Sequence, residues 1–500
     1  MQREVIAMLF LGFSAGIPIL LIFSSLSLWL LEAGVERSAV TFFSWAALGY
    51  SFKFVWAPLV DTLPLPVLHR LLGRRRSWLL LSQCAIVFSI LLMSSTDPAV
   101  GVDSLTIMAV AAVLLGFSSA TQDIVIDAYR IESAPSAIQA LLSSTYIAGY
   151  RIGMLVAGAG ALFLASILGS QADQYSYVAW QETYMIMASL MLVGILTTIL
   201  IKEPVSSNKR AAIYGARDYA SFLLFFLLAA GGFVASFFYS AGLASDIKQQ
   251  LMTLSGNKYL AAFIVELMRL SMALFVVWVI ARVLTVTNLI NQEMVRSTYF
   301  EPVKDFFSRY GTKVAVLLLL LIGLYRISDI VLGVISNVFY QDLGFTKIEI
   351  ASIVKTFGLF MTLAGGFLGG VLSIRYGVIR ILFLGALLSA TTNLLFMLLA
   401  QAGHHTGLLY LVISADNLSG GLATAAFVAF LSSLTNMSFT AVQYAIFSSL
   451  MTLLPKILGG YSGSMVDSLS YSGFFAMTAL MGLPVIFLIW LLVRVLPDPS

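Results

Sequence analysis

Basic side chains interrupt several apolar segments of this 500-residue chain. A Lys or Arg at the centre of a membrane-spanning helix costs about 2.5–3.5 kcal/mol on insertion scales, so it is retained where it faces protein, water or a bound anion. We therefore interpret these residues as markers of a pathway for an anionic solute. They are Lys53, Arg151, Arg269, Arg326, Lys355 and Lys456.

Carboxylates lie in or at the ends of the same segments and could carry protons. Asp123 and Asp127 are four residues apart, so they share one face of a helix and could share a proton or a cation. A helix-end salt bridge to Arg130, to Arg151 or to the cluster Arg74–Arg76 is the structural alternative. The candidates for proton coupling are Asp123, Asp127, Asp329 and Asp416.

A solute with carboxylates could use both kinds of cation, because Arg binds a carboxylate bidentately and Lys offers a mobile point charge. Arg326 and Asp329 are three residues apart, so they could instead neutralise each other. Lys53 and Lys355 could also pair with Asp123 or Asp416. The substrate-binding candidates are Lys53, Gln122, Tyr150, Arg151, Arg326, Lys355, Asn417, Gln443 and Lys456.

The elements that position these residues are predicted to be membrane-spanning helices. The chain is 60% hydrophobic and 10% charged, whereas soluble domains are about 25% charged. About fourteen segments are long enough to cross a bilayer of about 30 Å. We place them at 5–31, 38–60, 78–95, 104–126, 140–168, 182–201, 219–245, 258–281, 312–340, 348–373, 379–401, 406–433, 440–463 and 472–495.

Lys and Arg concentrate in alternate loops, which predicts that both termini are cytoplasmic. The spans divide as six, two and six: an N-terminal bundle at 1–201, cytoplasmic linkers with an inserted helix pair at 202–311, and a C-terminal bundle at 312–500. The inserted pair carries Glu266 and Arg269, which are close enough in sequence to neutralise each other.

Six spans followed by six suggest two parallel repeats, the arrangement of major facilitator transporters. The loop after the second span contains Ala57-Pro58-Leu59-Val60-Asp61 and Gly73-Arg74-Arg75-Arg76, which resembles the major facilitator loop motif. Its counterpart in the second half is the segment 370–377, with Arg375. We expect a cytoplasmic gate, although the arginines could simply anchor the topology. The gate candidates are Asp61, Arg74, Arg75, Arg76 and Arg375.

Ordered motifs across most of the chain resemble AmpG-type muropeptide permeases. They include 11–18, 52–61, 73–80, 119–128, 149–155, 304–307, 354–358 and 416–421. The resemblance implies proton-coupled import of N-acetylglucosaminyl-anhydromuramyl peptides across a bacterial inner membrane for peptidoglycan recycling, with an indirect effect on β-lactamase induction. The central position of the inserted pair departs from the family. The Gln122-Asp123…Asp127 segment also resembles acetyl-CoA transporters, so transport of acetyl-CoA or another anionic solute is the alternative.

An enzyme is not expected. The sequence lacks G-x-x-x-x-G-K-[ST], H-E-x-x-H and G-x-S-x-G, which would mark phosphate-binding, zinc-protease and serine-hydrolase chemistry. A polytopic lipid-linked sugar transferase is the less favoured enzyme class. One cysteine and no Cys/His cluster with ligand spacing argue against a metal site. We expect no cofactor and no nucleic acid partner, and a monomer that works with an anionic solute, protons and the lipid bilayer.

Overall fold

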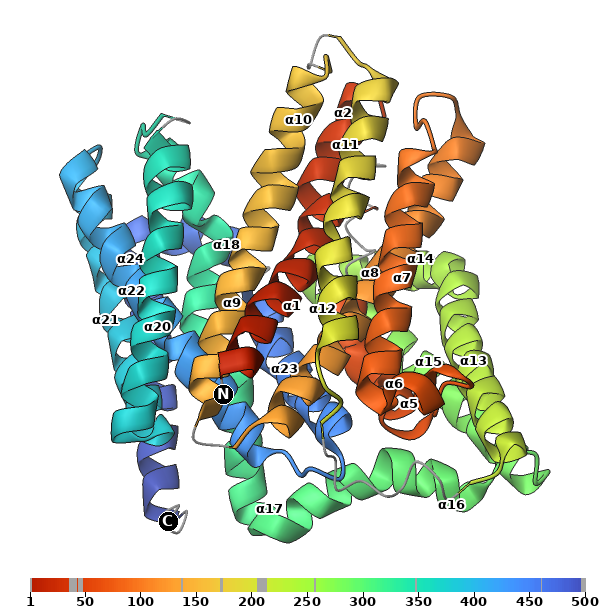
Figure 1. The fold of residues 1–500 in the computed structure, drawn as a ribbon. Coiled ribbons are helices and arrows are strands. Elements are labelled where there is room, and N and C mark those ends of the chain that lie inside the picture. Colours follow the sequence, from red (N-terminus) through yellow and green to blue (C-terminus); the bar gives the residue numbers. More distant parts are fainter. Residues whose placement is uncertain are drawn as a thin grey trace. The chain divides into compact units, whose positions relative to one another are not determined.

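The computed structural model describes residues 2–35, 43, 48–135, 138–170, 174–204, 214–255, 258–346, 349–459 and 461–495, and these residues form helices joined by short connections (Figure 1). Among the described residues, thirteen helical segments are long and apolar enough to cross a membrane. Each overlaps one predicted span, but several bounds differ by five residues or more: the helix predicted at 104–126 continues to Ser133, and the segment Gln292–Asp342 starts well before the predicted span 312–340. The remaining predicted span, 38–60, lies partly outside the described residues.

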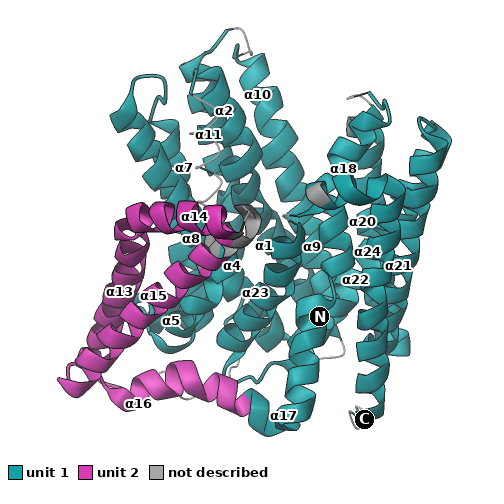
Figure 2. Cartoon of the chain, turned by 180° about the vertical axis from the view of Figure 1, so that it is seen from behind, with its two compact units in different colours: residues 1–207, 306–500 teal, residues 208–305 magenta. Residues whose placement is uncertain are grey.

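Contacts divide the chain into two compact units, residues 1–207 with 306–500, and residues 208–305 (Figure 2). In the larger unit, the first half contains α1 (Gln2–Leu20), α2 (Leu26–Glu32), α4 (Leu48–Phe52), α5 (Ala57–Thr62), α6 (Leu68–Leu72), α7 (Arg74–Ser94), α8 (Val102–Ser133), α9 (Gln139–Leu155), α10 (Ala161–Ile167), α11 (Tyr177–Leu190) and α12 (Leu192–Leu200). Its second half contains most of α17 (Glu301–Leu324), then α18 (Ile327–Asp342), α20 (Gly358–Tyr376), α21 (Val378–Ala402), α22 (Thr406–Leu434), α23 (Thr440–Gly459) and α24 (Ser462–Val495).

The smaller unit holds the inserted pair, α13 (Ala216–Tyr239) and α15 (Lys258–Val286), together with α14 (Ala241–Ser255) and α16 (Gln292–Val295). The predicted span 219–245 is therefore too long, because its helix ends at Tyr239 and a separate helix follows. Arg269 donates to the Phe237 carbonyl at 2.7 Å and to the Ser240 hydroxyl at 3.3 Å. The predicted Glu266–Arg269 pair depends on a side chain outside the described set.

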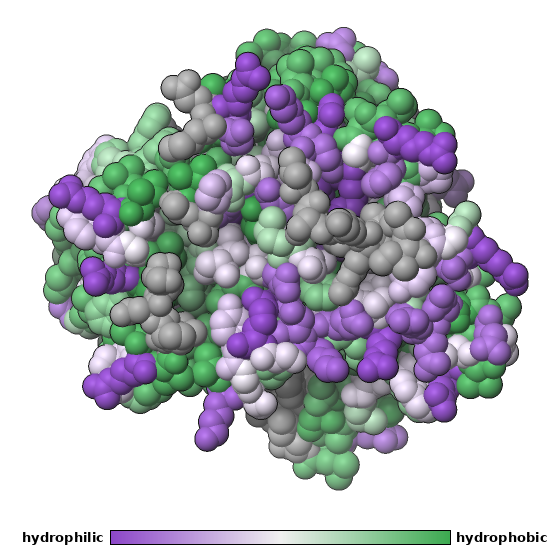
Figure 3. All heavy atoms as spheres, turned by 60° about the horizontal axis from the view of Figure 1, so that its bottom comes forward, coloured by the Kyte–Doolittle hydropathy of each residue, from purple (hydrophilic) through white to green (hydrophobic). Residues whose placement is uncertain are grey.

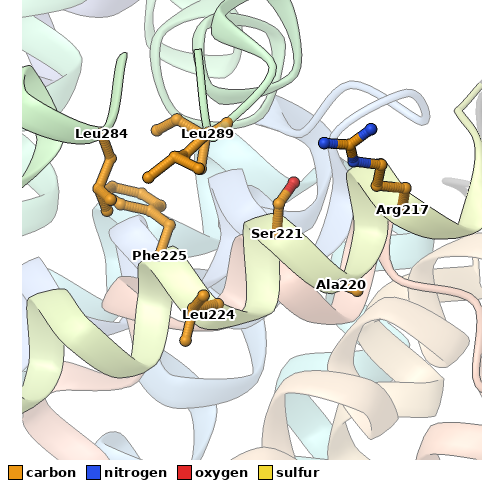
Figure 4. Close-up of a pocket in the computed structure, with 8 residues that line it drawn as sticks. Arg217, Ala220, Ser221, Leu224, Phe225, Leu284 and Leu289 are labelled. Carbon is orange, nitrogen blue, oxygen red and sulfur yellow. The ribbon is translucent and has the colours of Figure 1, made fainter. Parts of the chain in front are cut away.

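An apolar hollow lies within this smaller unit, between the start of α13 and the end of α15 (Figure 4). Leu224, Phe225, Leu284 and Leu289 line it, with Arg217 and Ser221 toward one end. None of the predicted solute-binding residues contributes to this hollow, so the candidate site is built elsewhere.

Each half of the larger unit has its own buried core. Trp29, Trp180 and Tyr184 belong to the core of the first half, and Phe339 and Phe475 to that of the second. The indole rings of Trp29 and Trp180 stack 5.6 Å apart. Two separate cores are what two bundles that move relative to each other require.

Glycines bring α1 and α9 into backbone contact. A Cβ atom on Gly149 would lie 1.9 Å from the Leu9 carbonyl oxygen, and one on Gly12 would lie 2.1 Å from the Tyr146 carbonyl oxygen. Only a residue without a side chain allows such an approach, which is how small residues pack membrane helices. This contact fixes the face of α9 that carries Tyr150 and Arg151.

Two predicted spans are broken at charged residues. A 3-10 turn, Lys53–Val55, separates α4 from α5, and Tyr325–Arg326 separates α17 from α18. These breaks were not predicted from the sequence. Broken helices expose polar backbone, which is tolerated in a membrane where it is buried in protein or lines a water-filled cavity.

The two halves contact each other through α9 with α20 and α22, and through α23 with α5 and α8. Ser144 near the start of α9 donates to the Gly366 carbonyl at 2.7 Å. Figure 3 views the lower face of the molecule in Figure 1, and hydrophilic side chains spread across it while hydrophobic side chains gather toward its edges. We call the end where α8 finishes and α9 and α23 begin the closed end.

Candidate functional site

Asp127 is the centre of a buried charge cluster near the closed end. Its Oδ2 lies 3.7 Å from Lys53 Nζ, and its Oδ1 lies 3.4 Å from Arg130 Nη2. The side chains of Lys53 and Asp127 are only 9% and 12% exposed. The expected pairing of Lys53 with Asp123 or Asp416 is thus replaced by a pairing with Asp127, because the break before α5 brings the lysine to that turn of α8.

Asp123 lies one helical turn earlier and is also buried. Its Oδ1 accepts a hydrogen bond from the Tyr146 hydroxyl on α9 at 3.4 Å. Among the described residues it makes no salt bridge within 4 Å. Protonation of Asp123 would therefore break no direct ion pair, whereas protonation of Asp127 would leave two cations without their shared carboxylate.

Cations of both halves have exposed side chains although they lie within spans. Arg151 on α9, Lys355 at the start of the span that includes α20, and Lys456 on α23 are all exposed. Lys456 Nζ lies 3.3 Å from the Ser51 hydroxyl of the first half. Arg151 makes no side-chain hydrogen bond or salt bridge to any described residue, so its charge is available to a solute.

Arg326 and Asp329 form the predicted local pair, with Nε 3.1 Å from Oδ2. Arg326 Nη1 also donates to the Thr424 hydroxyl at 2.8 Å. The guanidinium group of Arg326 is close enough to interact electrostatically with Arg151 of the first half, and with Asp416 on α22. Two like charges, one from each half, therefore act on each other, and an anion bound between them would relieve their repulsion.

The amide candidates do not join these exposed cations. Gln122 is fully buried, and its Oε1 accepts from the Ser14 hydroxyl at 3.5 Å. Gln443 is buried at the closed end, where its Oε1 accepts from Arg309 at 3.0 Å. Asn417 accepts from Thr362 at 2.9 Å and so holds α22 to α20. In this structure these three side chains bond to other protein groups, and their role in solute binding stays a prediction. Tyr150, half-buried beside Tyr146, is the other polar candidate.

The gate candidates Asp61 and Arg75 form a salt bridge of 2.7 Å between Oδ1 and Nη2. Arg75 Nε also donates to Glu132 at 3.1 Å, and Arg74 Nη2 lies 3.3 Å from the same carboxylate. The second oxygen of Asp61 accepts from the backbone amide of Val442 in the first turn of α23, at 3.0 Å. Asp61 therefore joins the charged cluster of the first half to the N-terminus of a second-half helix, where a negative charge is favoured.

Arg76 and Arg375 lie outside this cluster. Arg76 donates to the Thr198 carbonyl at 2.9 Å and so holds α7 to α12. Arg375 is exposed in the last turn of α20, with its guanidinium 5.4 Å from the centre of the Tyr376 ring. Neither residue bonds to Asp61 in this structure, and their part in a cytoplasmic gate stays a prediction.

Two acidic residues that bind the arginines of α7 were not among the residues predicted from the sequence. Glu132 lies in the last turn of α8. Glu203 accepts from the backbone amides of Arg75 and Arg76 at 2.8 and 3.1 Å, which caps α7. Three consecutive arginines at the start of α7 were the sequence signal that could have indicated these partners. Buried arginines need carboxylates nearby, and these had to come from other parts of the chain.

No group of three or more His, Cys, Asp or Glu side chains suited to a metal ion occurs in the part of the chain that the structure describes. His404 and His405 point to different partners. His404 Nε2 lies 3.3 Å from Glu349, and His405 Nδ1 accepts from the Leu408 amide. The charge clusters above are thus the chemical features that remain.

Sequence comparisons find related proteins over nearly the whole chain. A Rickettsia conorii protein that carries the name AmpG 4 is 31% identical over 479 residues, which cover 96% of this chain and 94% of that protein. The Escherichia coli anhydromuropeptide permease is 28% identical over 478 residues, covering 95% of this chain and 77% of the permease. A family model described as acetyl-coenzyme A transporter 1 matches residues 5–210.

Solved structures share the fold at low sequence identity. The proton:xylose symporter XylE, in the major facilitator superfamily, superimposes with a TM-score of 0.62 at 13% identity and covers 98% of this chain and 95% of its own. The major facilitator transporter FucP in its outward conformation superimposes with a TM-score of 0.61 at 10% identity, and the match covers 98% of each chain. The predicted major facilitator fold is confirmed.

Proposed function

Because the chain belongs to the AmpG family of the major facilitator superfamily, we propose that it imports anionic anhydromuropeptides across a bacterial inner membrane by alternating access. The Escherichia coli relative is named for this solute class. The observation that supports the proposal most is Arg151, an exposed cation within a span with no partner in the described structure, on which Arg326 of the other half acts electrostatically. The family consists of transporters, which sets aside the transferase alternative.

The proposed solute site lies between the halves, with Arg151, Arg326, Lys355 and Lys456 as cations and Tyr150 as a polar ring. Arg151 and Arg326 would bind carboxylates of the peptide, and the lysines would adjust to its length. Asp416 lies near Arg326 and would compete with the solute for it, so we place it with Asp329 among the groups that respond to solute arrival.

Proton coupling is proposed to depend on Asp123 first. Its partner is a neutral phenol, so it can gain or lose a proton without separating an ion pair. Lys53 interacts with both Asp123 and Asp127, which links the two carboxylates electrostatically. A proton that drives import would then enter at Asp123, next to Asp127, which holds the two cations as long as it is charged.

The closed end is proposed to face the cytoplasm, with both termini on that side. Arg74–Arg76 and Arg130 lie there, as the distribution of basic residues requires. Asp61 and Val442 would separate when the protein opens inward. In a cell, import of anhydromuropeptides would also influence β-lactamase induction, and a monomer suffices for this cycle.

A binding measurement tests the solute site without requiring a complete transport cycle. Labelled anhydromuropeptide is bound to purified protein, and Arg151→Gln is compared with Arg375→Gln, the same chemical change at an exposed position outside the site. Losing a charged hydrogen bond of about 1.5–3 kcal/mol predicts a Kd at least roughly tenfold higher for Arg151→Gln only. Equal Kd values for the two variants would contradict the assignment of the site.

Acetyl-CoA is the second candidate solute, since the acetyl-coenzyme A transporter family model matches residues 5–210. It is also anionic, so the cations alone do not discriminate. Direct binding does: labelled acetyl-CoA binds the purified protein and labelled muropeptide does not if the second candidate is correct, and the reverse holds if the first is.

A further inference from the structure

Arg130 is a fully buried cation that connects both halves of the transporter. It lies near the end of α8, and none of its side chain reaches solvent. Its Nη1 lies within hydrogen-bonding distance of Gln139 at 3.0 Å and Ser143 at 3.1 Å, both in the first half. The same nitrogen lies 2.9 Å from the hydroxyl of Ser432 on α22, in the second half.

A second contact crosses between the halves at the same place. The guanidinium carbon of Arg130 lies 5.2 Å from the centre of the Tyr444 ring on α23, within the range of a cation–π interaction. The Ser432 hydroxyl donates its own proton to the Val428 carbonyl at 2.6 Å, so its oxygen is left to accept from Arg130. Both contacts require that α22 and α23 lie against α8 at the closed end.

The charge of Arg130 is balanced by one carboxylate. Asp127 is the only acidic group of the described residues within 4 Å of it, at 3.4 Å, and Lys53 shares that carboxylate. A buried ion that loses its partner is strongly disfavoured, since the desolvation cost is then uncompensated. The position of Arg130 therefore depends on the negative charge of Asp127.

We propose that Arg130 is a positioning residue that transmits the charge state of Asp127 to the contact between the halves at the closed end. While Asp127 is negative, Arg130 is held where it can bind Ser432 and Tyr444. When Asp127 is neutralised, Arg130 loses its counter-charge, and the closed end separates more readily. This inference rests on the proposed alternating-access function, and it assigns the link between the buried charges and the movement.

Other groups around Asp127 set the conditions under which this link operates. The titratable and charged side chains that act on it are Lys53 from the turn before α5, Asp123 and Arg130 from α8, Tyr146 from α9 and Tyr444 from α23. Of the two cations that pair with Asp127 in the described structure, Arg130 is the one whose guanidinium also contacts the second half, at Ser432 and Tyr444. It is the member of the cluster placed to pass a change on.

The test measures opening of the closed end directly. Cys84 is the one cysteine of the chain, so Cys84→Ser gives a background without thiols, and Ala441→Cys places a thiol at a buried position beside Val442. The rate of alkylation of this thiol in purified full-length protein, without solute, reports how often the closed end opens. We compare three single variants, Asp127→Asn, Arg130→Gln and Ser432→Ala, with the double variant that combines Asp127→Asn and Ser432→Ala. Ser144→Ala is the matched control, because Ser144 also binds across the halves but has no contact with Asp127 or Arg130.

We expect Asp127→Asn and Ser432→Ala each to increase the alkylation rate, by roughly tenfold for the loss of a hydrogen bond to a charged donor. The fold increases in alkylation rate should not multiply in the double variant, because both substitutions act through Arg130. When Asp127→Asn is combined with Ser144→Ala, the fold increases of the two substitutions should multiply. Arg130→Lys, which keeps the charge, serves if Arg130→Gln does not fold.

Multiplicative effects of Asp127→Asn and Ser432→Ala would overturn the proposal, as would an unchanged rate in Asp127→Asn. Each variant is first shown to be monodisperse in detergent. The assay needs no transported solute, so a wrong assignment of the solute leaves its result intact. Conversely, failure of the coupling leaves muropeptide binding unaffected.

Discussion

Two carboxylates on one helix face have different partners, and the difference sets their roles. Asp127 is held by Lys53 and Arg130, whereas Asp123 is bound by the hydroxyl of Tyr146. The i, i+4 spacing predicted that they share a face, but it could not show which one would pair with cations. The partners come from α9 and from the turn before α5, and their distances depend on how those segments pack.

Asp123→Asn tests the proposed proton carrier. The amide keeps the size of the side chain and can still bond to Tyr146, but it cannot exchange a proton. We expect solute binding to stay within about threefold of the wild type and pH-driven accumulation to be lost. The measurement is uptake into proteoliposomes with and without an inward proton gradient, and retention of full gradient-dependent accumulation would reject Asp123 as carrier.

Glu349 offers a pH-dependent contribution to stability outside the spans, since it precedes the segment Ser352–Tyr376. Hydrogen bonds from the Thr346 amide and hydroxyl, followed by His404, lower the pKa of this carboxyl group from 4.5 to about 2. A lowered folded-state pKa means that the stabilisation is complete above pH 4.5 and declines as the pH falls toward 2.

Glu349→Gln should therefore lower the Tm at neutral pH, and the difference from wild type should shrink between pH 4.5 and 2. The effect is small because solvent reaches the side chain. Thermal unfolding in detergent across this pH range measures it. A Tm difference that grows on acidification would contradict the assigned hydrogen bonds.

At the scale of elements, the packing of α1 on α9 depends on glycine. Gly149→Ala would place a methyl group on the Leu9 carbonyl oxygen, and overpacking of this kind costs about 1–3 kcal/mol or more. We expect a lower Tm and less folded protein. Gly333→Ala on α18 is the control, because nothing lies within 4 Å of its added methyl, and Ala favours a helix by about 1 kcal/mol. Equal stability of the two variants would contradict the close contact.

Hydropathy and loop charge predicted the spans because each span carries its own signal of about twenty apolar residues. The breaks at Lys53 and Arg326 left no comparable signal, since a single charge in an apolar run is compatible with a continuous helix. The helix α14 was missed because its residues follow the first inserted span without a clear boundary. Glu132 and Glu203 were missed as partners of Arg75 because their pairing joins residues 57 and 128 positions apart.

At the scale of the whole molecule, Asp61 combines a buried salt bridge with a contact between the halves. Removing one member of a buried ion pair destabilises by about 3–5 kcal/mol, so Asp61→Asn should lower the Tm and slow uptake. The amide can still accept from Val442, and Asp61→Ala should therefore slow uptake further. Asp103→Asn, at an exposed site in the first turn of α8, serves as the comparison. Uptake that is equally fast in all three variants would show that this contact does not limit the cycle.

The two cores and the cations on either side of their boundary suit a cycle in which the halves rock about a bound solute. The comparisons with known proteins establish the family and the fold, while the solute is inferred from the relatives and from Arg151 and Arg326. The identity of the transported solute therefore calls for a direct measurement.

That measurement is uptake by the purified protein in proteoliposomes of labelled anhydromuropeptide and of labelled acetyl-CoA, each with and without an imposed inward proton gradient. We expect the muropeptide to accumulate above its external concentration when the gradient is present, and acetyl-CoA not to accumulate. Accumulation of acetyl-CoA alone, or of neither solute by folded protein, would contradict it.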